Sequence, residues 1–325
     1  MMTGRDNIGK RRRILAELLI GQKDFPCDAK VSSRKGPAES KEGVWIMPVE
    51  YESRGYPNYI TGKGDMKLAY KRDKIKGFLL EPEKPNGKAA IALHQHNLEF
   101  GLGKSEVAGL RTGKRGREQQ YGLELAKMGY HVLCFDFLPF EDRMIGHEEF
   151  GAYGGERLVK QEGSLDGLEL MGIHVLDVMR GIDILNKEGF NEIGVVGHSL
   201  GGMVSAYSMA CDERIKAGAS NCGMGSFESV RSSGILHNWA WTVHGMRKEF
   251  GEIYKLFELI APRPFLISAA RNDKYFPIEG ARACATFGRG FYKSKRNLEL
   301  YEFNGGHSFP KEARERVYRF LEEHL

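Results

Sequence analysis

The chain has 325 residues, of which 41% are hydrophobic and 28% are charged, and its formal net charge at pH 7 is +5. This composition excludes an intrinsically disordered chain, and the length suffices for one large core. The basic residues mostly alternate with acidic ones, which is typical of a solvated surface and argues against nucleic acid as a partner. The basic run 10–13 is interpreted as the exposed face of a short helix rather than as a contact with RNA or an anionic membrane.

The N-terminal region has one short apolar stretch, 14–20, which Glu17 interrupts. It is too short to span a membrane, and no small-residue cleavage site of a signal peptide follows it. The five cysteines have no disulfide or metal-ligand spacing and are typical of buried thiols in a reducing compartment. These features predict a cytoplasmic protein.

In chain order, residues 1–42 predict an N-terminal helical extension, an amphipathic helix followed by a loop rich in Lys, Ser, Gly and Pro. Residues 43–325 predict one α/β domain. Strands expected at 44–49, 67–70 and 75–80 would form its antiparallel edge, ahead of a buried strand at 89–93. From residue 116 onward predicted helices and strands alternate, which indicates a mostly parallel central sheet with helices on both faces.

The most informative motif is the pentapeptide G-H-S-L-G at 197–201, which follows the apolar run 193–196 and precedes a helix-like segment. A strand that turns sharply into a helix holds its turn residue in a strained conformation, so small residues flank the turn. Such a turn exposes the serine hydroxyl, and the N–H groups of the helix N-terminus stabilise a developing oxyanion. The pattern predicts a nucleophile elbow with Ser199 as the nucleophile.

The acid and the base follow the serine along the chain in hydrolases with such an elbow. The apolar run 264–270 predicts a strand that ends before Asp273, and the alternating run 298–303 predicts a strand that ends before His307. Reactive groups converge outside the carboxyl ends of the strands in open α/β sheets. We therefore expect a catalytic triad in which His307 takes the proton of Ser199 during attack on an ester carbonyl and Asp273 orients the imidazole.

An oxyanion hole needs two donors. The first expected donor is the backbone N–H of Leu200, and the second comes from the turn after the strand at 89–93, where His96 is favoured and Gln95 is the alternative. Asp136 also follows a predicted strand, but it precedes the serine, and its expected task is to hold the neighbouring loop.

The order of these features resembles that of the α/β-hydrolase superfamily. Within it, residues 75–325 resemble the dienelactone-hydrolase-like and acetyl xylan esterase-like serine esterases, also through the segments 140–143, 170–185 and 212–217. The resemblance implies the α/β-hydrolase fold, with 43–325 as the catalytic domain. Two departures stand out, since dienelactone hydrolases proper use cysteine in place of the serine and the family's usual His-Gly pair is His-Gln here.

Two irregular segments, 138–166 and 226–257, do not fit the minimal α/β pattern and are expected to form a cap. Arg143, Trp239 and Trp241 are the expected substrate contacts. The alternatives are a salt bridge of the arginine with Glu141 or Asp142 and ordinary packing of the tryptophans. Because both segments mix aromatic residues with many charges and glycines, they predict a preference for short acyl chains, acetyl to butyryl.

No cofactor and no metal are expected, because His94 and His96 have no carboxylate or cysteine nearby to complete a metal site. The expected partner is a small-molecule ester, with no nucleic acid and no membrane, and homo-oligomers are left open. Two other classes were weighed. A serine peptidase of the prolyl-oligopeptidase type normally needs a large gating domain, and a non-catalytic binding protein on the same fold usually lacks a triad member.

Overall fold

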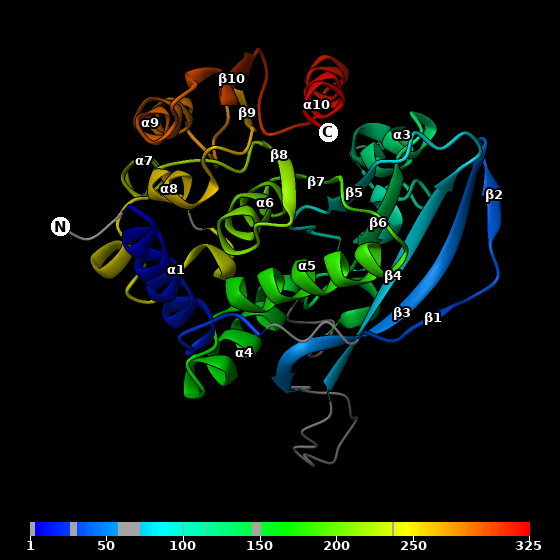
Figure 1. The fold of residues 1–325 in the computed structure, drawn as a ribbon, viewed down its shortest axis with the longest axis horizontal. Coiled ribbons are helices and arrows are strands. Elements are labelled where there is room, and N and C mark those ends of the chain that lie inside the picture. Colours follow the sequence, from blue (N-terminus) through cyan, green and yellow to red (C-terminus); the bar gives the residue numbers. More distant parts are fainter. Residues whose placement is uncertain are drawn as a thin grey trace.

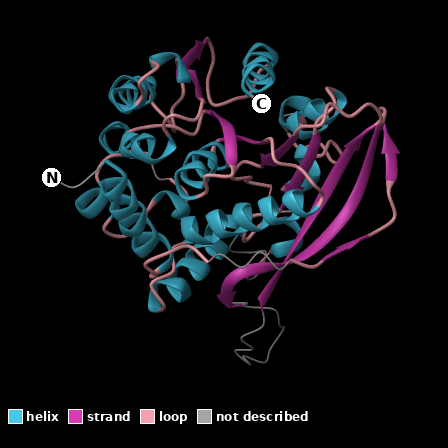
Figure 2. Ribbon diagram, in the orientation of Figure 1, coloured by secondary structure: helices cyan, strands magenta, loops and turns pink. Residues whose placement is uncertain are grey.

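The structure is a computed structural model, and it describes residues 4–26, 31–57, 72–99, 101–114, 116–144, 151–235 and 237–325. Ten strands in this part of the chain form one sheet, with helices packed on both of its faces (Figures 1 and 2). The helices are α1 (Gly4–Ile20), α2 (Lys104–Val107), α3 (Tyr121–Lys127), α4 (Gly151–Leu165), α5 (Leu170–Lys187), α6 (Leu200–Cys211), α7 (Phe227–Ser233), α8 (Phe257–Ile260), α9 (Ile278–Gly288) and α10 (Lys311–His324). The strands are β1 (Ser33–Lys35), β2 (Glu39–Lys41), β3 (Val44–Pro57), β4 (Arg72–Pro82), β5 (Ala89–Leu93), β6 (His131–Phe135), β7 (Ile193–His198), β8 (Ile215–Asn221), β9 (Phe265–Ala270) and β10 (Leu298–Phe303).

The strand order is β1-β3-β4-β6-β5-β7-β8-β9-β10, with β2 paired to β3. The six strands from β6 to β10 along this order pair in parallel, whereas β1, β2, β3 and β4 join them through antiparallel pairs. The expected fold class, a mostly parallel sheet covered by helices on both faces and preceded by an antiparallel edge, is confirmed. Because the central strands are parallel, the segments that follow β7, β9 and β10 emerge at the same edge of the sheet.

Two hydrophobic cores lie on opposite faces of the sheet. Within β5, Ala89, Ile91 and Leu93 belong to the core that includes α5 and α6, while Ala90 and Ala92 belong to the core that includes α3 and α10. This alternation places both faces of a central strand in contact with helices, which is why β5 is apolar along its whole length.

The N-terminal helix α1 packs into the larger core through Leu15, Ala16, Leu19 and Ile20. The backbone carbonyl of Leu19 also accepts the N–H of Glu169, just before α5, at 2.9 Å. The division of the chain into an extension and a catalytic domain stays a prediction.

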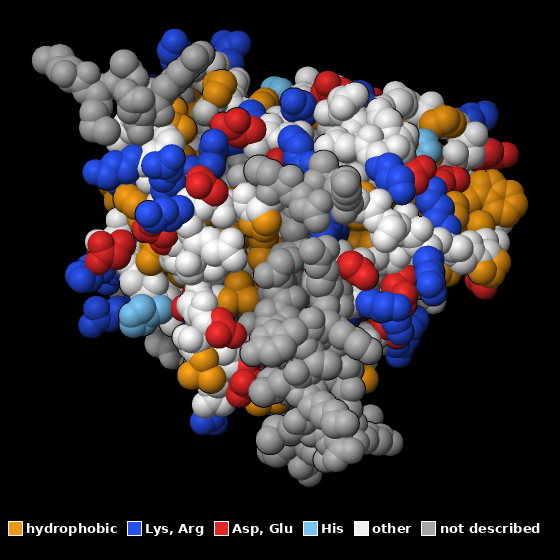
Figure 3. All heavy atoms as spheres, turned by 60° about the horizontal axis from the view of Figure 1, so that its bottom comes forward, with side chains coloured by type: hydrophobic (Ala, Val, Ile, Leu, Met, Phe, Trp, Pro, Cys, Tyr) orange, Lys and Arg blue, Asp and Glu red, His pale blue; other side chains and the backbone are white. Residues whose placement is uncertain are grey.

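The basic run of α1 is less exposed than expected. Arg11 forms an ion pair with Glu258 at 3.1 Å, and Arg12 forms one with Glu213 at 2.5 Å. Both acidic partners are more than 200 residues away, so local sequence offers no sign of them. Elsewhere, basic and acidic side chains are interspersed on the face shown in Figure 3.

The expected loop after α1 is only partly correct, because β1 and β2 pair antiparallel with β3. Both are three residues long and mostly exposed, so backbone hydrogen bonds to β3 hold them without any apolar pattern in their sequence. The strand expected at 67–70 lies outside the described residues, as does Cys27. In the part of the chain that the structure describes, no helix combines the length and the apolar character needed to cross a bilayer.

We expect Gly172→Ala to lower the free energy of unfolding by about 2 kcal/mol or more. A Cβ atom at Gly172 on α5 would lie 2.0 Å from the carbonyl oxygen of Leu19, so α1 would have to move. Gly9→Ala is the matched control, since its Cβ would meet nothing within 4 Å, and alanine there should stabilise the helix by up to about 1 kcal/mol. Urea denaturation followed by circular dichroism measures both, and equal stability of the two variants would contradict the close approach of α1 and α5.

Candidate active site

Ser199 lies at a sharp turn between β7 and α6. Its backbone has φ 56° and ψ −117°, a conformation that non-glycine residues rarely adopt. The flanking glycines make the turn sterically feasible: a Cβ at Gly201 would lie 2.0 Å from the carbonyl oxygen of Leu93, and one at Gly197 would lie 2.2 Å from the carbonyl carbon of Gly201. The structure thus contains the strand-to-helix turn that the pentapeptide predicts.

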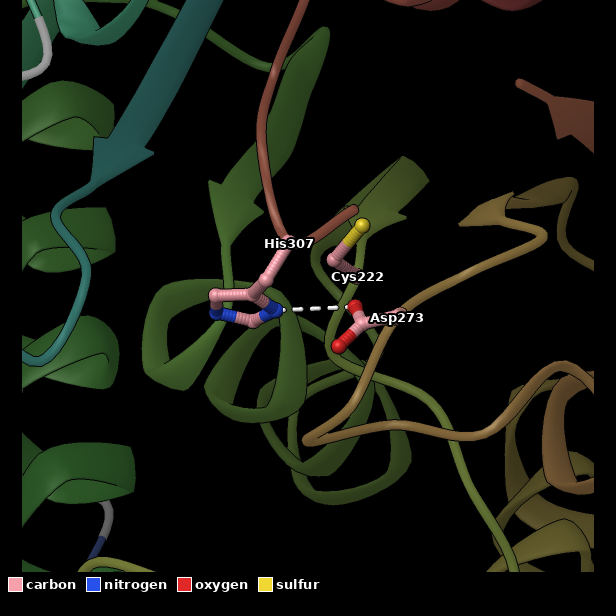
Figure 4. A group of neighbouring side chains, drawn as sticks. All are labelled: Cys222, Asp273 and His307. Atoms are coloured by element: carbon pink, nitrogen blue, oxygen red, sulfur yellow. Dashed lines mark hydrogen bonds and ion pairs between the residues drawn. The ribbon is translucent and has the colours of Figure 1, made fainter. Parts of the chain in front are cut away.

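The structure brings Ser199, Asp273 and His307 together from the ends of three parallel strands. The Ser199 Oγ lies 2.8 Å from His307 Nε2, and His307 Nδ1 lies 2.8 Å from Asp273 Oδ2. The carboxylate also accepts the backbone N–H groups of Tyr275 and Phe276 at 2.8 and 3.1 Å, which fixes its orientation. Figure 4 shows the imidazole and the carboxylate pointing toward one another.

Aromatic rings hold the imidazole of His307 in this orientation. Phe276 stacks on it with ring centroids 6.0 Å apart, Tyr275 meets it edge-on at 4.9 Å, and His198 lies 4.8 Å away. His198, beside Ser199 in the elbow, therefore packs against the imidazole of His307.

Asn221, at the end of β8, links the backbone of this site and was not foreseen from the sequence. Its side-chain amide donates to the carbonyl of Ser308 at 2.8 Å, and its backbone carbonyl accepts the N–H of Ser199 at 2.9 Å. The Ser268 hydroxyl in turn donates to its side-chain oxygen at 2.8 Å. One side chain thus connects the loop that carries His307 to β8 and β9. The only signal in the sequence was a polar residue at the carboxyl end of a predicted strand.

Cys222 lies beside Asp273 and His307, and Figure 4 shows the three side chains together. Cysteine, aspartate and histidine are metal ligands in many proteins. Here the carboxylate and the imidazole are bonded to each other. Burial raises the pKa of the Cys222 thiol, which favours its protonated form. The hydrogen bond between His307 and Asp273 therefore accounts for this group without a shared metal ion.

A cavity of about 50 Å³ opens at Ser199 and His307. The other described residues that line it are His96, Leu98, Tyr153, His237, Asn238, Tyr275 and Phe276. Both irregular segments reach the site, the first through Tyr153 of α4 and the second through residues 237 and 238. Among these residues the sequence predicted only His96, because no local pattern separates the others from ordinary loop residues.

His94 and His96 do not face a common metal. The Nδ1–H of His94 donates to the carbonyl of Gln95 at 2.7 Å, and its Nε2 accepts the N–H of Phe137 at 2.9 Å. Burial lowers the pKa of His94 to about 4, so this ring is neutral at pH 7 and serves as a structural link. His96 instead points its Nε2 at the fully buried Glu156 of α4, 3.3 Å away.

Arg143, an expected substrate contact, lies in the interior of the protein. The side chain is buried, and its Nη1 donates to the carboxylate of Asp177 on α5 and to the carbonyl of Asp136, both at 2.7 Å. It does not line the cavity at Ser199. The ion-pair partner shown for Arg143 is Asp177, 34 residues away, whereas the alternative expected from the sequence was Glu141 or Asp142.

The two tryptophans are also absent from the lining of this cavity. Trp241 is buried and packs against Phe227, His237 and Phe276, which is the packing role weighed against substrate contact. Trp239 is partly exposed, and its backbone N–H donates to Glu156 at 3.2 Å.

Asp136 holds the loop after β6, as expected, through the buried Lys104. The ammonium group of Lys104 lies 2.7, 2.9 and 2.8 Å from carboxylate oxygens of Asp136, Glu141 and Asp142. Burial raises the pKa of Asp136 to about 7 despite this pairing. Three clustered carboxylates could bind a metal ion, but the lysine occupies the position that a cation would take.

We expect Lys104→Met to lower the free energy of unfolding at pH 7 by about 3–5 kcal/mol, because it leaves buried carboxylates without a counter-charge. Lys74→Met is the control, since Lys74 pairs with Glu50 at the surface and its loss should cost about 1 kcal/mol at most. Chemical denaturation of both variants measures the difference. If Lys104→Met were no less stable than the control, the cluster would not be what holds this loop.

Comparisons with known proteins agree with this architecture. No protein-family model matches the chain. The YtaP protein of Bacillus subtilis (strain 168), whose name describes it as a hydrolase, is 25% identical over 263 residues that cover 78% of this chain and 84% of YtaP. Among solved structures, Methylesterase BT1017 has a TM-score of 0.65 at 16% identity, with 98% of this chain and 62% of that chain covered. This chain therefore spans less than two thirds of that methylesterase.

This chain covers most of the length of two further solved esterases. The glucuronoyl esterase from Solibacter usitatus has a TM-score of 0.64 at 13% identity, with 96% of this chain and 91% of that chain covered. A promiscuous CE15 esterase from the marine bacterial metagenome has a TM-score of 0.65 at 16% identity, with 99% and 91% covered. The sheet order, the elbow and these similarities together show that this chain has the fold of the α/β-hydrolase superfamily.

Proposed function

We propose that this protein is a serine hydrolase that cleaves carboxylic esters of short acyl chains through an acyl-enzyme intermediate. The observation that carries the proposal is the continuous hydrogen-bonded chain from Ser199 through His307 to Asp273, with both distances 2.8 Å. The similarity to YtaP and to solved esterases supports the same reaction class.

The hydrogen bonds assign the proton positions. Because an ionised carboxylate only accepts hydrogen bonds, His307 donates its Nδ1–H to Asp273, and its Nε2 is left to accept the hydroxyl proton of Ser199. As the Ser199 Oγ attacks the ester carbonyl, this proton moves to Nε2, and Asp273 stabilises the imidazolium that forms.

Collapse of the tetrahedral intermediate breaks the bond to the alcohol, which leaves with the proton from His307. The acyl group is then an ester of Ser199. A water molecule gives one proton to Nε2 and attacks the acyl carbon; the bond between the acyl carbon and Ser199 Oγ then breaks, the carboxylic acid is released, and Oγ takes the proton back from Nε2.

Backbone N–H groups stabilise the oxyanion in both steps. Leu200 is the first residue of α6, where the N–H groups of a helix have no acceptor within the helix and point toward the incoming negative charge. For the second donor we favour the N–H of His96, since this residue lines the cavity at Ser199 while the side chain of Gln95 is buried and directed at Glu106.

We expect Ser199→Ala to lower kcat for p-nitrophenyl acetate by about a million-fold while the protein stays folded, because no other group in the proposed mechanism can replace the nucleophile. Ser205→Ala on the same helix is the control, since the Ser205 hydroxyl donates only to the carbonyl of Gly201. Retained labelling of Ser199→Ala by a fluorophosphonate probe would show that the nucleophile is another residue.

We further expect kcat/KM to be highest for acetyl to butyryl esters and to fall at least about tenfold for octanoyl and palmitoyl esters. The cavity at Ser199 is small, about 50 Å³, so we expect the additional methylenes of a long acyl chain to gain little burial there. A panel of p-nitrophenyl esters measures this profile, and a kcat/KM that climbs steadily to octanoyl contradicts it.

A further inference from the structure

A second and larger hollow lies next to the cavity at Ser199. This groove has a volume of about 410 Å³ and is lined mainly by apolar side chains of α7 and of the segment after it, among them Val230, Ile235 and Met246. His237 is the residue that lines both the groove and the cavity.

The imidazole of His237 is fixed between residues of the two walls. Its ring lies 5.0 Å from that of Trp241, which lines the groove, and 4.8 Å from that of Phe276, which lines the cavity. Its Nε2–H donates to the backbone carbonyl of Tyr275 at 2.6 Å. One positioned side chain therefore stands between the space at the nucleophile and the apolar groove.

We propose that His237 is the specificity-determining residue that limits the acyl chain by closing the groove to it. The inference rests on the proposed esterase function. Because His237 lines both the cavity at Ser199 and the groove, an acyl group on Ser199 that extends toward the groove meets this wall. If the wall is removed, the apolar lining of the groove becomes available, and each further buried methylene strengthens transition-state binding about fourfold.

The test is to measure kcat/KM of the wild type and of His237 variants on acetyl, butyryl and octanoyl esters. The ratio of kcat/KM for the octanoyl ester to that for the acetyl ester should rise at least about tenfold in His237→Ala. His237→Phe is the size-matched control, which loses the hydrogen bond to the Tyr275 carbonyl but keeps a ring in the wall, and its ratio should stay within about threefold of the wild type. An equal rise in both variants would assign the effect to the lost hydrogen bond and overturn the proposal.

Two further variants test whether the acyl chain enters the groove. His237→Asn, which is smaller than histidine and retains a donor, should also raise the ratio. Adding Ile235→Lys to His237→Ala places a charge in the groove at a half-buried residue, and should return the octanoyl-to-acetyl ratio toward the wild-type value. If the ratio of kcat/KM for the octanoyl ester to that for the acetyl ester stays high in this double variant, the acyl chain does not enter the groove.

The outcomes separate the two proposals. A wild type that hydrolyses no ester overturns the proposed function and this inference with it. A wild type that hydrolyses the acetyl ester, combined with an unchanged ratio in folded His237→Ala and His237→Asn, overturns the inference alone. Thermal unfolding followed by circular dichroism establishes that each variant is folded.

Discussion

The close approach of backbone to backbone at the turn between β7 and α6 is the constraint on which the site depends. Gly201 lies against the carbonyl of Leu93 at the end of β5, and Gly223 lies against the carbonyl of Ser199, with no room for a Cβ at either position. This packing keeps Ser199 in a backbone conformation that costs free energy and that an unsupported loop would not retain. The N-terminus of α6 is thereby directed at the same point as the serine hydroxyl.

Buried charges position the loops around this turn. Lys104 with its three carboxylates and Arg143 with Asp177 both act on the segment after β6, which leads toward α4. Pairs of this kind are costly to desolvate, and removing one partner leaves an uncompensated buried charge. Residues 136–143, the start of the segment after β6, are therefore held by ion pairs and not by apolar packing alone.

The features that could be predicted from the sequence are those defined by a few neighbouring residues. The elbow, the strand before it and the short runs that precede Asp273 and His307 each have a local pattern, and a parallel sheet necessarily brings their ends to one edge. Contacts between distant segments lack such a pattern. The pairing of Arg143 with Asp177, the two short polar strands β1 and β2, and the position of His237 between two hollows depend on tertiary packing, which periodicity does not encode.

The docking of α1 bears on the order in which the chain folds. Helix α1 contacts α5, and its Arg11 bonds to Glu258, a residue 247 positions later. Closing so long a loop costs entropy that is recovered only when both ends are in place, so contacts of this kind form late. During synthesis the apolar face of α1 stays exposed until its partners, which come later in the chain, have been made. Until then this face is a target for chaperones and proteases.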